Sequence, residues 1–321
     1  MSNLTSKNLD HLLNLALNAA QRAGEAILRE QKNLKIYTKD DGSPLSSADL
    51  ASNEALCEAL ASSDIAVCSE ESPLDYATRK DLARFWLIDP LDGTKGFIKG
   101  SGEFCILLAL IERARPILSL IAKPATRQTY YAHAHSPLYK DAKPLKIAPE
   151  AYEQSRKIAL LSVHHPSPLN QAFLDKNALT PLKISSALKF IALLEGRAGV
   201  YHRFESLHSW DIAAGDFLLN KNGGFMGKFS GNLLKKYQNS LKNGENSAQA
   251  FQGGENSNKN SAKIFKNSAP KFENGENSAQ SFQGGENLGI SQDDFINYNA
   301  KTFLCPHFIA LSKKEWLNNL N

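Results

Sequence analysis

The sequence predicts a mixed α/β fold in which helices and sheets are stacked in layers. An amphipathic helical stretch opens the chain, short apolar segments follow in the first half, and predicted strands alternate with predicted helices in the second. With 321 residues, of which 42% are hydrophobic and 22% charged, the chain can bury a large core. We expect a single domain over residues 1–321 with two lobes, at about 1–150 and 151–321.

Two helices are predicted near the N-terminus. From Leu9 to Leu28, apolar side chains recur at intervals of three and four residues, which is typical of one face of an α-helix. Residues 40–44, Asp-Asp-Gly-Ser-Pro, indicate a turn. Ser46 or Ser47 is a candidate N-cap for the second helix, which would carry Asp49.

The segments that follow are mostly predicted strands. Residues 64–69 form a short one that ends at Glu70-Glu71, and the apolar Phe85–Ile88 leads into Asp-Pro-Leu-Asp-Gly-Thr at 89–94. Further strands are expected at 104–111, 117–121, 130–131, 158–161 and 200–204, with helices near 187–194 and 211–219. Carboxylates therefore fall at strand ends and at one helix start.

The stretch from Gln238 to about Gly289 breaks this pattern. It is rich in Asn, Gly, Ser, Gln and Glu and poor in aliphatic residues, so it cannot build a core. Residues 243–256 return almost unchanged at 274–287, but two copies are too few for a stacked solenoid. We interpret the stretch as a mobile surface insertion, with binding to a partner as the alternative.

Charge and cysteine usage disfavour several classes of protein. The formal charge of +4 arises from 37 basic and 33 acidic residues without a long basic run, which disfavours a nucleic-acid binder. The four cysteines are widely spaced and are predicted to be reduced thiols. No secretory signal is visible, and the longest apolar run, 106–111, is too short to cross a bilayer. We expect a cytoplasmic protein, and peripheral contact with the inner membrane stays open.

Four separated carboxylates carry the predicted chemistry. Glu70 follows a strand, Asp89 and Asp92 lie three residues apart around a proline, and Asp211 opens a helix. Hard divalent cations such as Mg²⁺ prefer oxygen ligands, and Gly93 lets the backbone approach a phosphate closely. Taken alone, each of these acids has a simpler interpretation, as part of a capped turn, as a helix N-terminal charge or as a solvated loop residue. Their combination favours a site for metal and phosphate together.

With these segments in order, the sequence resembles the inositol monophosphatase superfamily of Mg²⁺-dependent, lithium-sensitive phosphatases. The shared signatures are Glu70-Glu71 after a strand, Asp-Pro-x-Asp-Gly-Thr at 89–94 and Trp-Asp-x-Ala-Ala-Gly at 210–215. The segments 41–44, 86–104, 188–196 and 203–204 are similar to the CysQ branch, the 3′(2′),5′-bisphosphate nucleotidases. The resemblance covers about residues 9–237 and resumes at 298–311.

The resemblance implies an α/β/α/β/α layered sandwich that hydrolyses adenosine 3′,5′-bisphosphate to AMP and phosphate. The phosphosulfate analogue is a further expected substrate, in sulfur assimilation and nucleotide recycling. Two or three Mg²⁺ ions per site would activate the attacking water. The implied metal ligands are Glu70, Asp89, the Leu91 carbonyl, Asp92 and Asp211. The residues implied to position and deprotonate the water are Asp49 and Thr94, with Ser46 where the family usually has threonine.

The substrate end is implied by the same resemblance, and three segments depart from it. Residues expected to contact the substrate are Glu70, Gly93, Thr94, Ser162, His164, Lys189, Arg203 and Asp211. Gly96 stands where the branch usually has Glu, Glu-Ser-Leu at 205–207 replaces a Gly-Pro-Thr or similar turn, and Ser-Ser-Ala at 185–187 replaces Gly-Ser-Ser. The metal ligands are untouched, but the departures fall on substrate recognition, so the preferred substrate stays open among nucleotide bisphosphates, adenylyl sulfates and inositol phosphates.

Two other functions stay open. Within the same fold, the chain would be an inositol monophosphatase or a fructose bisphosphatase, which lack an adenine-sized cleft beside Lys189 and Arg203. In a different class, it would be a metal-binding regulatory or interaction module, although intact Asp49, Thr94 and carboxylates favour catalysis. A monomer or homodimer with a small phosphorylated substrate, and without nucleic acid, is expected.

Overall fold

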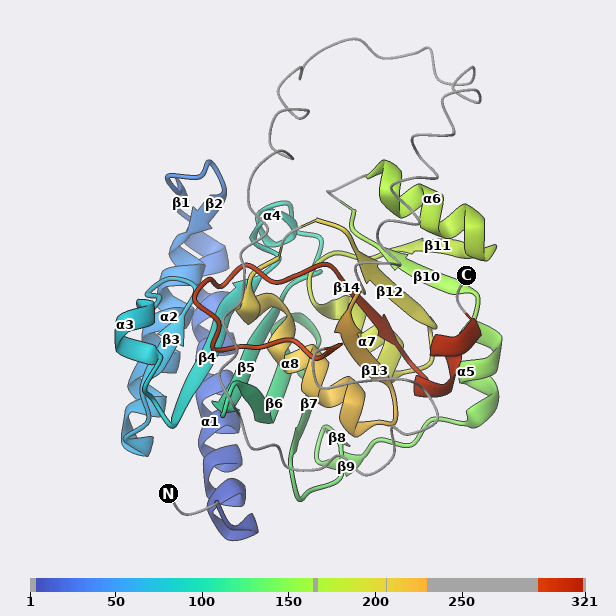
Figure 1. Ribbon diagram of the computed structural model, residues 1–321. Coiled ribbons are helices and arrows are strands. Elements are labelled where there is room, and N and C mark those ends of the chain that lie inside the picture. The colour runs from blue at the N-terminus through green and yellow to red at the C-terminus, as the bar shows by residue number, and fades with distance from the viewer. Residues whose placement is uncertain (1–3, 164–166, 206, 230–293, 320–321) are drawn as a thin grey trace.

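Two large β-sheets alternate with layers of helices in the computed structural model of the chain (Figure 1). The structure describes residues 4–163, 167–205, 207–229 and 294–319. The sheets have seven and five strands, and a two-stranded ribbon stands apart from them. The insertion predicted at about 238–289 lies outside the described residues.

The N-terminal helical layer consists of α1, Ser6–Glu30, and α2, Ser47–Leu60. Between them, β1, Ile36–Thr38, and β2, Pro44–Ser46, form the antiparallel ribbon around the predicted turn. Ser46 caps α2 through a capping box, in which the carboxylate of the third helical residue, Asp49, accepts a hydrogen bond from the Ser46 backbone N–H. Both predicted helices are confirmed, and Ser46 rather than Ser47 is the N-cap.

The seven-stranded sheet follows chain order, β3-β4-β5-β6-β7-β8-β9. Its strands are β3 (Val67–Ser69), β4 (Arg84–Asp92), β5 (Cys105–Glu112), β6 (Arg115–Lys123), β7 (Gln128–His133), β8 (Tyr139–Lys140) and β9 (Lys143–Pro144). The short elements between them are η1 (Gln31–Asn33), η2 (Ala61–Ser63), α3 (Tyr76–Arg79), α4 (Thr94–Ile98) and η3 (Pro124–Thr126). β3 and β4 run parallel, and the remaining neighbours run antiparallel.

Both faces of the seven-stranded sheet are buried, which explains why its strands are apolar without alternation. Along β4, Trp86 and Ile88 pack in the cluster formed with α1 and α2. Phe85 and Leu87 point to the opposite face and pack in a second cluster that includes α7 and α8. Successive side chains of a strand point to opposite faces, so one strand supplies both cores.

The second half of the chain builds the five-stranded sheet, in the order β11-β10-β12-β14-β13. The helices and strands of this half of the chain are α5 (Pro149–Ser155), β10 (Ile158–Leu161), α6 (Pro168–Asn177), β11 (Thr180–Lys183), α7 (Leu188–Leu194), β12 (Val200–Arg203), α8 (Ser209–Lys221), β13 (Phe225–Lys228), β14 (Phe308–Leu311) and η6 (Lys314–Asn319). β14 comes from beyond the insertion and pairs antiparallel with both β12 and β13. The last described segment therefore completes the sheet begun before the insertion.

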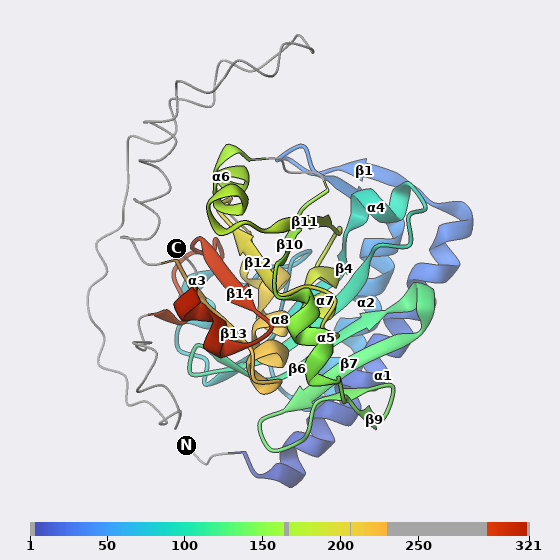
Figure 2. The ribbon, with the colours of Figure 1, turned by 90° about the vertical axis from the view of Figure 1, so that its right-hand side faces the viewer.

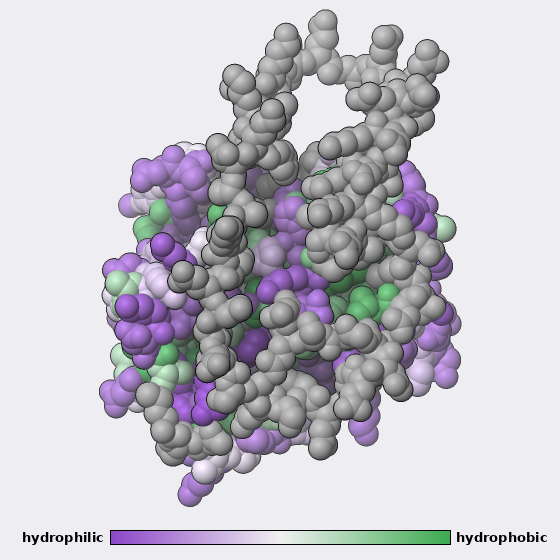
Figure 3. Space-filling view, viewed as in Figure 1, coloured by the Kyte–Doolittle hydropathy of each residue, from purple (hydrophilic) through white to green (hydrophobic). Residues whose placement is uncertain are grey.

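The layers stack as helices, sheet, helices, sheet, helices. α7 and α8 lie between the sheets in one core, and a third core joins the outer face of the five-stranded sheet to Tyr152 of α5 and Phe173 of α6. Figure 2 shows α1 and α2 along one side of the molecule, with β13 and β14 toward the other. On the face drawn in Figure 3, hydrophilic residues predominate along the visible edge over the N-terminal helices, as amphipathic outer helices require. The predicted layered α/β/α/β/α fold is confirmed.

The structure corrects the end of one predicted strand. β4 continues through Asp89 to Asp92, with an irregularity in its pairing to β5 between those two residues, so Pro90 lies inside the strand rather than after it. A proline is tolerated there because a bulge removes the need for its missing N–H.

All four cysteines are free. Within the described residues, no helix has both the length and the apolar character needed to cross a membrane. The division into two lobes stays a prediction.

Candidate active site

Three acidic side chains from separate elements converge at one end of the seven-stranded sheet. Glu70 follows β3, Asp89 lies in β4, and Asp211 lies in the first turn of α8. One carboxylate oxygen from each lies within 4.8 Å of the other two. The structure thus brings together residues up to 141 positions apart in the chain, as the sequence predicts for a shared site.

The irregularity in β4 is held by specific hydrogen bonds. Ser52 Oγ of α2 donates to the Pro90 carbonyl at 2.6 Å, and the Leu91 N–H donates to Asp89 Oδ1 at 3.0 Å. Gly93 follows with φ of 99°, and a Cβ there would lie 2.7 Å from the Glu103 carbonyl oxygen. Both the positive φ and the close approach require glycine.

Burial and mutual repulsion act on these carboxyl groups together. Burial raises the pKa of Asp89 well above its ordinary value, and the charges of Glu70 and Asp92 raise it further. Burial also raises the pKa of Asp211, with Asp92 and Glu70 adding to the effect. A divalent cation would relieve this repulsion, and a donor set made of oxygens suits a hard ion such as Mg²⁺. The residues present therefore fit a metal.

Asp92 contacts the second half of the chain directly. Its Oδ2 accepts a short hydrogen bond from the Ala187 N–H and a longer contact from Cys105 Sγ, at 3.7 Å. Burial raises the pKa of Asp92, while the Ala187 N–H and the charge of Lys189 oppose the rise. Ala187 belongs to the Ser-Ser-Ala departure, so this departure adjoins a predicted metal ligand and leaves it in place.

The predicted catalytic side chains form a chain of hydrogen bonds beside the acidic cluster. Thr94 Oγ1 donates to Asp49 Oδ1 at 2.9 Å and also lies 3.2 Å from the Leu91 carbonyl oxygen. Ser46 holds the other oxygen, Asp49 Oδ2, through its hydroxyl at 2.5 Å and its backbone N–H at 2.8 Å. Burial raises the pKa of Asp49, and the bonds from Ser46 and Thr94 act in the opposite direction. Asp49 is thus fixed at both oxygens.

Lys39 is a site residue that the sequence did not reveal. It follows β1, and its Nζ lies 2.7 Å from Glu70 Oε1 and 2.8 Å from Glu71 Oε1. Burial raises the pKa of Glu71, and the Lys39 ammonium offsets part of that rise. The only sequence signal was the turn at 40–44, which indicates a hairpin but not where the hairpin folds.

At the predicted substrate end, Lys189 is buried and its ammonium group is engaged by backbone carbonyls. Lys189 is 5% exposed, and its Nζ donates to the carbonyl oxygens of Ser186 at 2.6 Å and Ile184 at 3.2 Å. Burial lowers the pKa of Lys189 to about 8, against the pull of Asp92. Ser162 is half-buried directly after β10, and His164 lies outside the described residues. Lys189 therefore holds the loop that carries Ala187, beside the acidic cluster.

Glu205, one of the departures from the family pattern, forms an ion pair with Arg203 on the Nε side of the guanidinium, without a hydrogen bond to that nitrogen. Glu205 Oε2 lies 3.3 Å from Arg203 Nε, whose side chain is 5% exposed. Asn170 of α6 donates to both oxygens of Glu205, at 3.0 and 3.2 Å. The charge of Arg203 opposes the raised pKa of Asp211, which places this pair within electrostatic reach of the acidic cluster.

Gly96, the third departure, has a local steric reason. A Cβ at this position would lie 2.8 Å from Ser101 Oγ and 3.2 Å from the Glu103 carbonyl oxygen. Ser101 Oγ in turn donates to the Gly96 carbonyl at 3.0 Å. The tight turn after α4 therefore leaves no room for the glutamate that is usual in the branch.

Comparison with known proteins agrees with this architecture. The model of the inositol monophosphatase family matches residues 8–268. The 3′(2′),5′-bisphosphate nucleotidase CysQ of Salmonella typhimurium is 32% identical over 229 residues, covering 70% of this chain and 93% of the relative. The protein of the same name from Escherichia coli K12 is 31% identical over the same length.

Solved structures share the fold. The CysQ structure from Bacteroides thetaiotaomicron, described as a bacterial member of the inositol monophosphatase family, has a TM-score of 0.63 and 24% identity, covering 94% of this chain and 97% of that one. The IMPase structure from Thermotoga maritima has a TM-score of 0.60 and 20% identity, covering 74% and 99%. The chain belongs to the inositol monophosphatase family.

Proposed function

We propose that this protein is a Mg²⁺-dependent phosphomonoesterase that hydrolyses adenosine 3′,5′-bisphosphate to AMP and phosphate. The observation that carries the chemistry is the convergence of Glu70, Asp89 and Asp211, with carboxylate oxygens within 4.8 Å of one another. The choice of substrate is supported by relatives at 31 and 32% identity, which are named as 3′(2′),5′-bisphosphate nucleotidases. The phosphosulfate analogue is proposed as a further substrate, and sulfur assimilation with nucleotide recycling as the setting.

The proposed metal ligands are Glu70, Asp89, the Leu91 carbonyl, Asp92 and Asp211. When bound there, two or three Mg²⁺ ions would neutralise the phosphate and make an attacking water more acidic. The chain's own contribution is to fix the ligands before substrate arrives. Ser52 and the bulge in β4 hold the Asp-Pro-Leu-Asp segment, and the Ala187 N–H holds Asp92.

Thr94 and Asp49 are proposed to manage the proton of the attacking water. Because the Thr94 hydroxyl donates to Asp49 Oδ1, the lone pairs of Thr94 Oγ1 are left to accept a hydrogen from water. The water's proton would move to Thr94 Oγ1 as the hydroxyl proton passes to Asp49 Oδ1. Burial of Asp49, which raises its pKa, makes it a better acceptor for that proton. Ser46 keeps the other oxygen occupied, so only one acceptor faces Thr94.

A second candidate is an inositol or sugar phosphatase, and the Glu205–Arg203 pair favours it. The negative charge of Glu205 beside Arg203 Nε would repel a second phosphate near this guanidinium, whereas a hydroxyl group would donate to the carboxylate. The acidic cluster and the Thr94–Asp49 pair would serve both substrates equally. The two candidates therefore differ only at the substrate end.

Phosphate release tests the proposal. The substrates are adenosine 3′,5′-bisphosphate, its 2′-phosphate isomer, inositol 1-phosphate and fructose 1,6-bisphosphate, each with Mg²⁺, and Asp92→Asn serves as the inactive control. We expect the bisphosphate nucleotide to be hydrolysed fastest by the wild type and not by the variant. A preference for inositol or sugar phosphate would select the second candidate. The absence of Mg²⁺-dependent release from all four would refute phosphomonoesterase activity.

A further inference from the structure

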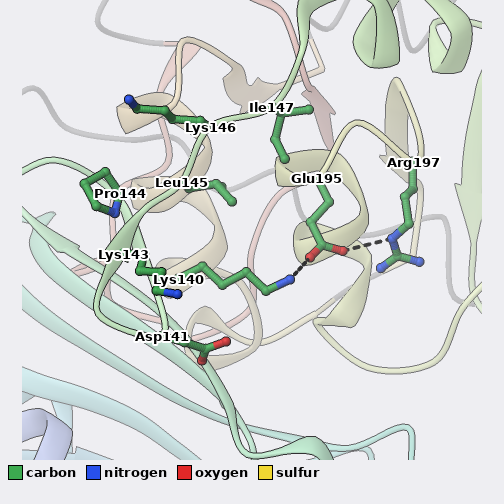
Figure 4. Close-up of a pocket in the computed structure, with 9 residues that line it drawn as sticks. All are labelled: Lys140, Asp141, Lys143, Pro144, Leu145, Lys146, Ile147, Glu195 and Arg197. Carbon is green, nitrogen blue, oxygen red and sulfur yellow. Dashed lines mark hydrogen bonds and ion pairs between the residues drawn. The ribbon is translucent and has the colours of Figure 1, made fainter.

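An open cavity of about 610 Å³ lies at the surface outside the acidic cluster, and its volume is in the range of small-molecule sites. It is formed by the β8–β9 hairpin, the segment that leads to α5, and the end of α7 (Figure 4). The residues that line it are Lys140, Asp141, Lys143, Pro144, Leu145, Lys146, Ile147, Glu195 and Arg197. None of them belongs to the candidate active site.

The lining combines positive charge with an apolar surface. Four cations and two carboxylates leave an excess of two positive charges, while Pro144, Leu145 and Ile147 supply the apolar part. Lys143 and Lys146 are exposed, and no ion pair involves either of them within the described chain. This composition suits a small dianion with a flat or cyclic apolar body, since the cations neutralise the charge and the apolar side chains cover the body.

One wall of the cavity is already organised. Glu195 Oε1 accepts from Lys140 Nζ at 2.6 Å and from the Tyr130 hydroxyl at 2.5 Å, and Glu195 Oε2 accepts from Arg197 Nε at 3.0 Å. Figure 4 shows Lys140 and Arg197 reaching this carboxylate from opposite sides. Because Arg197 uses Nε for Glu195, its two terminal nitrogens can still bind an anion in a fixed orientation.

The same wall connects the cavity to the acidic cluster through one helix. Glu195 is the C-cap of α7, and every residue of α7 is buried. Before the first turn of α7, the Ala187 N–H donates to Asp92. Seven residues make a helix of about 10 Å, and a packed helix this short moves as a rigid body. A ligand that draws Lys140 or Arg197 away from Glu195 would therefore act at one end of an element whose other end positions Asp92.

From these observations we infer that the Lys143–Lys146–Arg197 cavity binds a phosphorylated small molecule with a cyclic apolar body, and that its occupancy modulates hydrolysis through α7. This inference does not depend on the identity of the substrate hydrolysed at the acidic cluster. The ligand chemistry is that of a nucleoside monophosphate or a similar phosphate monoester.

Binding is measured on the full chain with adenosine 5′-monophosphate as the probe and a chelator in place of Mg²⁺. Without metal, the acidic cluster repels a dianion, so binding there is suppressed. We expect saturable binding by calorimetry, weakened by added salt, with inorganic phosphate binding more weakly and uncharged adenosine binding least. Lys143→Ala combined with Lys146→Ala should weaken binding about tenfold, because two partly exposed charge contacts are lost.

The matched control is Lys7→Ala combined with Lys32→Ala, which removes two exposed lysines of α1 and η1 without touching the cavity. The control should bind like the wild type. A second readout is the rate of phosphate release with Mg²⁺ at increasing probe concentration, which should change in the wild type in a way that the Lys143/Lys146 variant lacks. Absence of saturable binding, or equal binding by the two double variants, would overturn the site. Identical responses of the two rates to the probe would overturn the modulation.

Discussion

The acidic cluster and the substrate end lie side by side, yet they differ in how firmly the chain specifies them. In and beside the cluster, the predicted side chains are held by specific hydrogen bonds, such as those from Ser46 and Thr94 to Asp49 and from the Ala187 N–H to Asp92. At the substrate end, Arg203 is paired with Glu205, and Lys189 is engaged by backbone carbonyls. The chemistry of phosphate hydrolysis constrains the first region, whereas the shape of the leaving group constrains only the second. Substrate choice can therefore differ while the residues proposed for catalysis stay the same.

The largest expected effect comes from the cluster itself. Thr94→Val keeps the shape of the side chain but removes the hydroxyl that donates to Asp49 Oδ1. We expect kcat to fall by about 10²–10⁴, the usual contribution of a positioned proton acceptor, while Mg²⁺ binding measured by calorimetry is unchanged. Thr94→Ser, which restores the hydroxyl, should recover most of the rate. A valine variant with more than about a tenth of wild-type kcat would exclude Thr94 from proton transfer.

The next expected effect concerns acid stability and arises at His202, which packs beside Phe173 and Phe204. Burial of His202 in β12 lowers its pKa from 6.5 to about 3. The unfolded chain therefore takes up the proton first, and stability is lost as the pH falls from about 6.5 toward about 3. Between pH 7.5 and 5.0 this one group should cost about 2 kcal/mol of the free energy of unfolding.

His202→Phe tests this loss, because an apolar ring fits beside Phe173, whose centroid lies 4.2 Å from the His202 ring. Urea unfolding at pH 7.5 and 5.0 should show that the variant loses about 2 kcal/mol less than the wild type over this interval. If the free energy of unfolding falls equally in the two proteins, folded His202 takes up its proton over the same pH range as the unfolded chain.

The sequence could predict features set by local patterns and motifs, but not those set by how distant segments fold together. α1 and the long strands β4 to β6 were predictable, since their apolar periodicity is set by burial against a layer on each side. Short elements such as α3 and β8–β9 carry too few residues for a period to emerge. The roles proposed for Asp89 and Asp211 followed from linear motifs. The contacts of Lys39 and Glu205 could not be predicted in this way, because they depend on how a hairpin and a loop fold against distant residues.

Glu205→Gln separates the two candidate substrates at the substrate end. The change removes the negative charge that lies beside Arg203 Nε and keeps a side chain of the same length in contact with Asn170. We expect KM for adenosine 3′,5′-bisphosphate to fall about tenfold relative to KM for adenosine 3′-monophosphate, because only the former has a 5′-phosphate that the Glu205 charge beside Arg203 would repel. The matched control is Glu153→Gln, at an exposed position of α5, which should change neither value. Equal changes for both nucleotides would show that Arg203 does not sense the second phosphate.

The smallest expected effect lies where the β1–β2 ribbon meets the cluster. The Lys39 ammonium contacts both Glu70 and Glu71, so a divalent cation that uses Glu70 must compete with a tethered monovalent one. Lys39→Met keeps the length of the stem and removes that competitor, and the Mg²⁺ concentration for half-maximal rate should fall about three- to tenfold. Lys35→Met, at an exposed position before β1, is the matched control and should leave it unchanged. If Lys39→Met instead raises the Mg²⁺ requirement, Lys39 assists Mg²⁺ binding, for example by orienting Glu70. The β1–β2 ribbon would then support the metal site rather than compete with the metal.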